Sequence, residues 1–271
     1  MKKKPIDVSM LAMPMSRSRY GDDPYSTKLV EKFEDFDEFK DLQKFIGNSD
    51  SNNEWVFRSV IAKDKCVIKW LKKHATEFEQ LLIVSVGLDT KADALECLQD
   101  KESYGLDICK DDILNIYEYA GIKTKTKILQ CDLEKDVNDE LLANLIEEGF
   151  DIKKKTCVLW IGASFYISKE SIDHTLDFFD KNINISHFVI DFMNKSVFQP
   201  PRNETVRLQL EALQGSELVW KSFYSYEEIQ NLYRKHGFEN IEIIFHGEAE
   251  YEAYGEVTLE DDMMFTSFAI R

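Results

Sequence analysis

Apolar and polar positions follow two different periods along this chain. From about residue 80 onward, short β-prone apolar runs are separated by longer stretches whose apolar residues have helical spacing. This alternation is typical of a mostly parallel sheet with helices on both faces. The apolar runs predict seven strands, at residues 81–86, 103–106, 126–130, 157–161, 187–192, 241–245 and 264–270.

The stretches around the strands predict helices at 92–99, 111–120, 138–147, 170–179, 204–213 and 226–236. The last of these has clear boundary signals. Ser225 can cap its first turn, Glu228 completes a capping box, and Gly237 can end the helix. The final two strands are separated by the acidic segment 248–262, which has no convincing helical pattern, so we expect them to pair antiparallel through a long connection.

The first 79 residues carry helical patterns at 28–39 and 56–73 and a polar interruption at 47–53, but no run of strands. We therefore expect an N-terminal helical lid at 1–79, followed by an α/β domain at 80–271 in one globular unit. The predicted fold is a seven-stranded, mostly parallel, doubly wound sheet of Rossmann-like type with an antiparallel last strand.

Composition narrows the range of functions. The chain has 271 residues, 44% of them apolar, which is enough for a sizeable core, and its formal net charge of −16 disfavours a nucleic-acid partner. Five cysteines form no C-x-x-C pair and are expected to be reduced and buried, and no metal site is predicted. Polar residues interrupt the basic N-terminal stretch before it reaches signal-peptide length, so we expect a cytoplasmic protein without a membrane segment. The oligomeric state stays open.

Candidate chemistry gathers just after the predicted strands, because ligands of open parallel sheets bind outside the carboxyl ends of the strands. Ser85, Gly87 and Asp89 follow the first strand, and a glycine there lets a ligand approach the backbone. Asp107 follows the second strand, about 20 residues further on, the spacing at which an acid reaches ribose hydroxyls. Asp132 follows the third strand and can accept a hydrogen bond from an exocyclic amine.

Each of these residues also has a structural interpretation, since a glycine at a strand end often serves the turn and an aspartate often caps a helix. Three acids at three consecutive strand ends favour a ligand site.

After the fourth strand, small residues precede aromatic ones, which suits a floor under a ligand and a wall facing a substrate; these are Gly162, Ala163, Phe165 and Tyr166.

The chain resembles the class I S-adenosylmethionine-dependent methyltransferases, and among them the leucine carboxyl methyltransferase family with its bacterial polyketide O-methyltransferase relatives. The segment 83–91, Ile-Val-Ser-Val-Gly-Leu-Asp-Thr-Lys, is similar to the family's L-G-x-G-x-D-T-R. Leu106-Asp107-Ile108 resembles the segment with the acidic V-D motif at the family's second strand. Asp132-Leu133 is similar to the family's D-L pair. The segment 20–25 resembles the N-terminal Y-W-x-D-P-Y of the carboxyl methyltransferases, and 58–63 falls where the family has a paired-arginine helix.

The resemblance implies S-adenosylmethionine as cofactor. It implies that Gly87 approaches the methionine part, that Asp107 binds the ribose, and that Asp132 and Leu133 flank the adenine. Lys63 falls on the arginine that would meet the cofactor carboxylate, with Arg58 nearby. The full set of cofactor-binding candidates is Arg58, Lys63, Ser85, Gly87, Asp89, Asp107, Ile108, Cys131, Asp132, Leu133, Gly162 and Ala163.

Three departures from the family pattern bear on the chemistry. Ser85 replaces the first motif glycine, Lys63 and Lys91 replace arginines, and the glutamate expected in the segment 160–164 is missing. The leading hypothesis is an O-methyltransferase acting on a small molecule, with a carboxylate among the favoured acceptors. One alternative is a non-methylating enzyme that cyclises or transfers the aminocarboxypropyl chain and releases methylthioadenosine. The other is a degenerate, non-catalytic binding module.

The histidines offer no obvious general base, and only His246 follows a strand end. The absence of a clear base mildly favours a carboxylate acceptor, which attacks without one. Tyr20 and Tyr166 are the candidates for positioning the reacting groups. Substrate contacts are expected from the lid, the fourth-strand segment and the region after the fifth strand: Tyr20, Tyr25, Phe165, Tyr166, Asn194, Arg202, Trp220 and Tyr224.

Overall fold

The computed structural model describes residues 8–21, 23–47, 54–214, 219–257 and 262–271. Its centre is one eight-stranded sheet in which the main path of strands runs β3-β2-β1-β4-β5-β8-β7, with the short β6 paired to β5. The strands are β1 (Gln80–Val84), β2 (Glu102–Asp107), β3 (Lys127–Gln130), β4 (Thr156–Trp160), β5 (Ile185–Asn194), β6 (Phe223–Tyr224), β7 (Asn240–Phe245) and β8 (Met264–Ile270).

All seven predicted strands are present, each within two residues of its expected ends, and the mostly parallel α/β fold is confirmed. The eighth strand, β6, was missed because a strand of two residues leaves no readable alternation in the sequence. β8 pairs antiparallel with both β5 and β7, as expected for the last strand, and it lies between them in the sheet.

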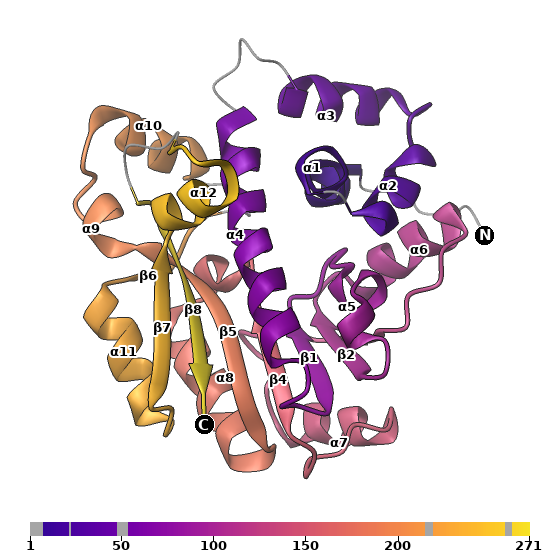
Figure 1. The fold of residues 1–271 in the computed structure, drawn as a ribbon, viewed down its shortest axis with the longest axis vertical. Helices are drawn as coiled ribbons and strands as arrows, with labels where there is room; N and C mark the ends of the chain where they lie inside the picture. The colour runs from indigo at the N-terminus through magenta and orange to yellow at the C-terminus, as the bar shows by residue number, and fades with distance from the viewer. Residues whose placement is uncertain (1–7, 22, 48–53, 215–218, 258–261) are drawn as a thin grey trace.

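Helices cover both faces of the sheet because the strands are apolar on both sides (Figure 1). Leu81 and Ile83 of β1 belong to a core shared with the N-terminal helices and α6, whereas Leu82 and Val84 belong to a core shared with α7, α8 and α11. The alternation of side chains along a strand thus divides one buried strand between two cores.

The helices are α1 (Ala12–Tyr20), α2 (Pro24–Glu31), α3 (Asp37–Gly47), α4 (Glu54–His74), α5 (Lys91–Ala94), α6 (Lys110–Ala120), α7 (Asp139–Glu147), α8 (Lys169–Asn182), α9 (Lys195–Phe198), α10 (Glu204–Leu213), α11 (Tyr226–Lys235) and α12 (His246–Tyr254). Three short 3-10 helices add to them: η1 (Val8–Leu11), η2 (Glu96–Leu98) and η3 (Ser164–Tyr166). No described helix is long and apolar enough to cross a membrane.

Several predicted helix boundaries were wrong. The pattern at 28–39 is divided between α2 and α3, because Asp23 caps a helix that begins at Pro24 and a turn follows it. The predicted helix 92–99 is α5 followed by η2, and α1 and α9 were not predicted. The polar interruption at 47–53 lies outside the described residues apart from Gly47.

The acidic segment after β7 contains a helix, α12, which corrects the expectation of an irregular connection. Glu248 accepts a hydrogen bond from the Phe245 N–H at 2.9 Å at its start, and Gly255 ends it in a left-handed conformation. Ala249 packs on Ala62 of α4, so contact with a distant helix supplies what the local pattern lacks.

The boundaries of α11 are confirmed. Ser225 Oγ accepts the Glu228 N–H at 3.1 Å, and a Glu228 carboxylate oxygen accepts the Ser225 N–H at 2.7 Å. Gly237 follows with φ +73°, a conformation that glycine adopts without strain.

All five cysteines are free thiols.

Candidate active site

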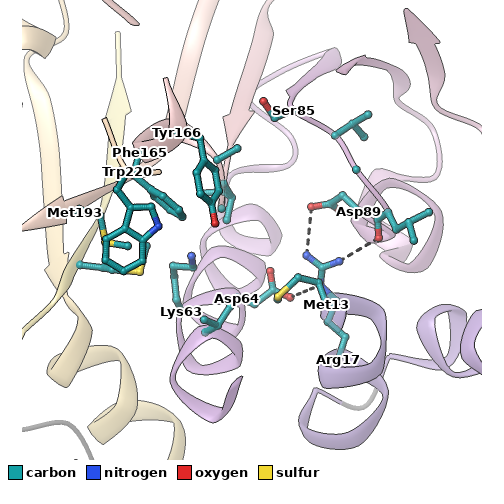
Figure 2. Close-up of a pocket in the computed structure, with 18 of the residues that line it drawn as sticks. Met13, Arg17, Lys63, Asp64, Ser85, Asp89, Phe165, Tyr166, Met193 and Trp220 are labelled. Atoms are coloured by element: carbon teal, nitrogen blue, oxygen red, sulfur yellow. Dashed lines mark hydrogen bonds and ion pairs between the residues drawn. The ribbon is translucent and has the colours of Figure 1, made fainter. Parts of the chain in front are cut away.

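A cavity of about 570 Å³ lies beside the carboxyl ends of β1 and β4 (Figure 2). The turn after β1 and the segment after β4 form one side, and α1 and α4 of the N-terminal segment form the other. Apolar side chains dominate its walls, and five of the seven methionines in the chain line it: Met10, Met13, Met193, Met263 and Met264. Methionine adapts its shape to irregular apolar partners, so these walls can accept a flat or irregular apolar molecule.

The backbone on the sheet side of the cavity leaves room for a ligand. Gly87 and Gly162 both line the cavity with positive φ, +48° and +86°, and a Cβ built on either would meet nothing within 4 Å. Ser85 also has a positive φ, +52°, a conformation that costs a non-glycine residue free energy and is common at functional sites. The motif glycine that Ser85 replaces therefore stands where the backbone requires a left-handed turn.

Asp107 fixes the turn after β1 from the neighbouring strand. Its carboxylate accepts the Gly87 N–H and the Cys109 N–H, both at 2.8 Å. Burial raises the pKa of Asp107, although these two N–H donors oppose the change. A carboxylate has about four acceptor positions, so two remain for a ligand.

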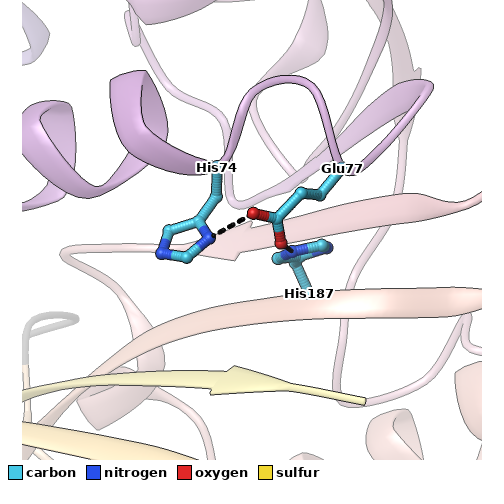
Figure 3. A group of neighbouring side chains, drawn as sticks. All are labelled: His74, Glu77 and His187. Atoms are coloured by element: carbon cyan, nitrogen blue, oxygen red, sulfur yellow. Dashed lines mark hydrogen bonds and ion pairs between the residues drawn. The ribbon is translucent and has the colours of Figure 1, made fainter.

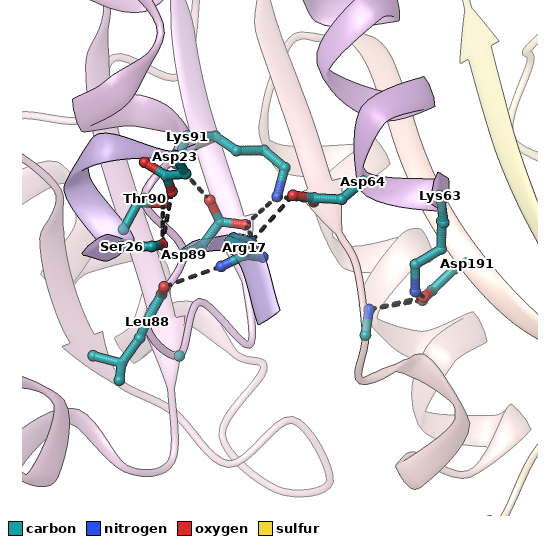
Figure 4. Close-up of polar contacts among 12 residues, drawn as sticks. Arg17, Asp23, Ser26, Lys63, Asp64, Leu88, Asp89, Thr90, Lys91 and Asp191 are labelled. Atoms are coloured by element: carbon teal, nitrogen blue, oxygen red, sulfur yellow. Dashed lines mark hydrogen bonds and ion pairs between the residues drawn. The ribbon is translucent and has the colours of Figure 1, made fainter. Parts of the chain in front are cut away.

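Asp191 of β5 performs the corresponding task after β4 (Figure 4). Both of its carboxylate oxygens lie 2.9 Å from the Gly162 N–H, and one accepts from Lys63 Nζ at 2.5 Å. The Lys63 and Asp191 side chains are only 4% and 0% exposed. Asp191 thus supplies a buried carboxylate next to the segment 160–164, in which the family's glutamate is missing.

Four charged side chains form a second buried network, and three of them, Arg17, Asp64 and Asp89, line the cavity (Figure 4). Arg17 Nε donates to Asp64 at 3.1 Å, and Lys91 Nζ lies 2.6 Å from Asp64 and 2.8 Å from Asp89. Burial alone would raise the pKa of Asp64, but the Lys91 and Arg17 charges outweigh it and hold the pKa below its ordinary value. Burial would likewise raise the pKa of Asp89, but the same two cations outweigh it and lower that pKa. The network joins α1 and α4 to the turn after β1.

The far end of the cavity has an aromatic wall. The rings of Phe165 and Tyr166 lie 4.5 Å apart between centroids, and Trp220 meets Phe165 edge-on at 5.9 Å. Figure 2 shows these rings on the side of the cavity opposite to Ser85 and Asp89, with Met193 beside Trp220. Burial raises the pKa of Tyr166, which keeps its hydroxyl protonated.

The structure brings together about half of the residues that the sequence singled out. Among those candidates, the cavity is lined by Lys63, Ser85, Gly87, Asp89, Gly162, Ala163, Phe165, Tyr166 and Trp220. Asp107 does not line the cavity itself, but its carboxylate accepts the N–H of Gly87, which does. Arg17, Asp64, Asp191 and the methionines were missed, because nothing in their local sequence distinguishes them from ordinary helix or strand residues.

The remaining cofactor candidates do not line this cavity. Arg58 pairs with Glu256 at 2.5 Å and lies over the Tyr254 ring. Asp132 holds Lys135 at 2.7 Å, and Ile108 is 58% exposed at the end of β2. The Leu133 and Cys131 side chains are buried in the core shared with α7 and α8. Their proposed contacts with the cofactor stay predictions.

Five substrate candidates also lie outside the walls of the cavity. Tyr25 donates to the Lys123 carbonyl, and Asn194 caps α9 through Ser196. The Tyr224 ring packs against Phe192 in the core shared with α7, α8 and α11. Tyr20 lies beside Arg19 on α1, and Arg202 is exposed before α10. Their proposed roles therefore need a substrate larger than the cavity or a movement of these segments.

His246 also lines the cavity, at the start of α12. It is 6% exposed, and neither ring nitrogen has a hydrogen-bond partner among the described residues. Buried polar groups are almost always paired, so this histidine stands out.

Three other side chains could hold a metal ion. His74, Glu77 and His187 each offer a ligand atom, all within 4.8 Å of one another, beside the amino end of β5 (Figure 3). Glu77 lies 3.0 Å from His74 Nδ1 and 3.2 Å from His187 Nε2, and Ser186 Oγ lies 2.8 Å from His187 Nδ1. Hydrogen bonds alone can satisfy this group, and it is separate from the cavity.

Solved structures place the fold among known enzymes. A proposed methyltransferase from Thermobifida fusca YX is similar with a TM-score of 0.58 and 12% identity, over 80% of this chain and 83% of that one. A magnesium protoporphyrin IX methyltransferase from Synechocystis PCC 6803, solved with S-adenosylhomocysteine, is similar with a TM-score of 0.50 and 12% identity, over 89% and 97%. The fold is therefore that of the S-adenosylmethionine-dependent methyltransferases.

The sequence profile of the leucine carboxyl methyltransferase family matches residues 9–180, and the chain belongs to this family. No curated protein matches it in sequence. The chain is an S-adenosylmethionine-dependent methyltransferase, and S-adenosylmethionine is its cofactor. The open backbone at Gly87 and Gly162 and the free acceptor positions on Asp107 fit such a group.

Proposed function

We propose that this methyltransferase is an O-methyltransferase acting on a small, largely apolar molecule. One observation carries the proposal: the glycine turn after β1 and the aromatic and methionine wall line the same cavity of about 570 Å³. A cofactor and an acceptor held there are next to each other and removed from bulk water. Both conditions favour direct transfer, because positioning supplies most of the rate enhancement.

The proposed roles of the residues follow the strand ends. Gly87 approaches the methionine part of the cofactor, Asp107 binds the ribose with its two remaining acceptor positions, and Asp132 and Leu133 flank the adenine. When bound, S-adenosylmethionine supplies a methyl group already activated on a sulfonium. Lys63 can donate to the cofactor carboxylate while it stays paired with Asp191, because an ammonium group has three donors.

The proposal keeps 1–79 as a lid. Met13 and Arg17 of α1, together with Val60, Lys63 and Asp64 of α4, form part of the wall of the cavity. Opening of this segment would admit ligands, and its closure would exclude water. The volume of the cavity, about 570 Å³, is in the range of small-molecule sites, which supports a small molecule.

The test measures cofactor binding first and products second. We expect isothermal titration to show S-adenosylmethionine binding, and incubation with a pool of small phenols, alcohols and carboxylic acids to yield S-adenosylhomocysteine and one methylated compound. Methylthioadenosine as the product would instead support cyclisation or aminocarboxypropyl transfer. Absence of binding heat and of thermal stabilisation by S-adenosylmethionine would support a non-catalytic module. Family membership and fold do not favour either alternative.

A further inference from the structure

His246 is the buried group whose chemistry the cofactor site does not use. It follows β7 and is the first residue of α12, the helix that lies against the upper part of α4 (Figure 1). The next residue is fixed: the Gly247 N–H donates to an Asp262 carboxylate oxygen at 2.8 Å. The imidazole is thus held on a defined backbone at the edge of the cavity.

Both ring nitrogens of His246 lack a hydrogen-bond partner in the described part of the chain, although the residue is only 6% exposed. A buried nitrogen without a partner is unfavourable unless a ligand or an ordered water supplies one. His246 lines the cavity, but its ring nitrogens expose almost no surface to it. A rotation of the ring would let a molecule bound in the cavity supply the missing partner.

The surroundings keep this imidazole neutral. Burial is the largest influence and lowers the pKa of His246, and the Lys63 charge on α4 lowers it further. A Ser59 backbone contact that falls short of hydrogen-bond geometry, Glu250 of α12 and Asp262 before β8 act in the opposite direction. A neutral imidazole has one acceptor nitrogen, which a general base requires.

The described side chains that line the cavity offer no unpaired cation to an anionic acceptor. Among the described residues that line it, the cations are Arg17 and Lys63, and each already faces carboxylates: Asp64 and Asp89 for Arg17, Asp191 for Lys63. A carboxylate acceptor would therefore have the sulfonium of the cofactor as its only free counter-charge, and it would make no use of a general base. A hydroxyl acceptor enters neutral and gives the unpaired imidazole a proton donor.

Building on the proposed function, we infer that His246 is the general base of the reaction and that the acceptor is a phenol, enol or alcohol rather than a carboxylate. The acceptor O–H donates to the unprotonated nitrogen of His246. As the acceptor oxygen forms its bond to the methyl carbon, the O–H electron pair stays on oxygen and the proton moves to His246. The products are the methyl ether and S-adenosylhomocysteine, and His246 later releases the proton to water.

The first test compares a matched pair of probes, 1-naphthol and 1-naphthoic acid, which share one ring system and differ in the acceptor group. We expect methylation of 1-naphthol and not of the acid, detected by mass spectrometry. His246→Gln should lower kcat by about 100-fold or more, the usual effect of removing a general base. The control His174→Gln changes a histidine of α8 that bonds the Val137 carbonyl, and it should keep wild-type kcat.

The pH profile separates a base from a merely structural histidine. In the wild type, kcat/KM should fall in acid below the usual histidine pKa of about 6.5, because protonated His246 cannot accept a proton. In His246→Gln the change of slope near pH 6.5 should vanish, and activity should instead rise steadily with pH until the phenol ionises by itself. A change of slope near pH 6.5 that persists in the variant, or a kcat within 3-fold of wild type, would overturn the inference.

A binding measurement decides the case if neither probe is methylated. In protein labelled with ¹⁵N-histidine and saturated with S-adenosylhomocysteine, 1-naphthol should shift the His246 nitrogen resonances, assigned with His246→Gln. If saturation with 1-naphthol leaves them unchanged, or the acid is the better substrate, the inference is wrong. Failure to bind S-adenosylmethionine at all is a different result, because it removes the proposed function itself.

Discussion

Asp107 and Asp191 perform equivalent tasks at two places in the sheet. Asp107 ends β2 and accepts the N–H of Gly87, which follows the adjacent strand β1. Asp191 lies in β5 and accepts the N–H of Gly162, which follows the adjacent strand β4. Both glycines have positive φ and line the cavity. A carboxylate on one strand thus holds open the turn that follows its neighbour.

Replacing Asp107 with asparagine should weaken cofactor binding while preserving side-chain shape. The variant loses the charge that strengthens the bond from Gly87 and the proposed bond from the ribose. Hydrogen bonds to charged groups contribute about 1.5–3 kcal/mol each, so we expect a Kd for S-adenosylmethionine that is roughly 10-fold to 100-fold weaker. Isothermal titration measures it.

The control for this substitution is Asp111→Asn, an exposed position in the first turn of α6 that should leave the Kd within about 2-fold. Unchanged affinity in Asp107→Asn, with the fold intact by circular dichroism, would contradict the proposed ribose contact.

Helix α11 shows how local signals in the sequence become stability. Its start has both bonds of a capping box, and its buried residues Ile229 and Tyr233 pack into the core shared with α8. The Tyr233 hydroxyl also lies 2.8 Å from Ser267 Oγ on β8. The helix is thereby tied to the last strand.

Ser225→Ala removes the cap of α11 and should lower the free energy of unfolding by about 1 kcal/mol, because the Glu228 N–H loses its acceptor. Urea denaturation followed by circular dichroism measures the change. Asn231→Ala, at an exposed position of the same helix, should change stability by less than about 0.5 kcal/mol. Equal effects of the two substitutions would show that the cap contributes nothing.

Charge acts on the whole molecule in two opposing ways. The net charge of −16 disfavours the compact state through self-repulsion. Locally, however, carboxylates are stabilised by close partners: Lys91 and Arg17 hold the pKa of Asp64 below its ordinary value, against the effect of burial. Burial would also raise the pKa values of Glu134 and Glu228. Hydrogen bonds from serines and lysines outweigh this effect and lower both pKa values to about 2.

Acid should therefore unfold the protein. A carboxyl whose pKa is lower in the folded state than in the unfolded state contributes stability that is fully present above the unfolded value, about 4, and is lost as the pH falls through the folded value. We expect Tm to change little between pH 7 and 5 and to drop steeply between pH 4 and 2. Circular dichroism melts at constant ionic strength measure this. A constant Tm down to pH 3 would contradict it.

Much of the fold could be predicted from the sequence because its signals are local. Strand β1 was readable as a run of apolar residues, and the cap of α11 as three residues in fixed spacing. Helix α12 was not readable, because its acidic face gives a weak pattern and its buried face depends on α4. The turn at Gly87 was found from its place after a strand, whereas Asp191 was hidden inside an apolar strand.

The sequence by itself determined the seven long strands and their order along the chain, the antiparallel last strand and the acids at the strand ends, since each rests on neighbours along the chain. Tertiary structure decided which of these residues share a cavity. Lys63 and Asp191 are 128 positions apart and meet only when α4 lies across the sheet. His246 likewise reaches the cavity only because β8 is inserted between β5 and β7 and α12 returns onto α4. Such meetings depend on packing between distant segments, which a local pattern does not encode.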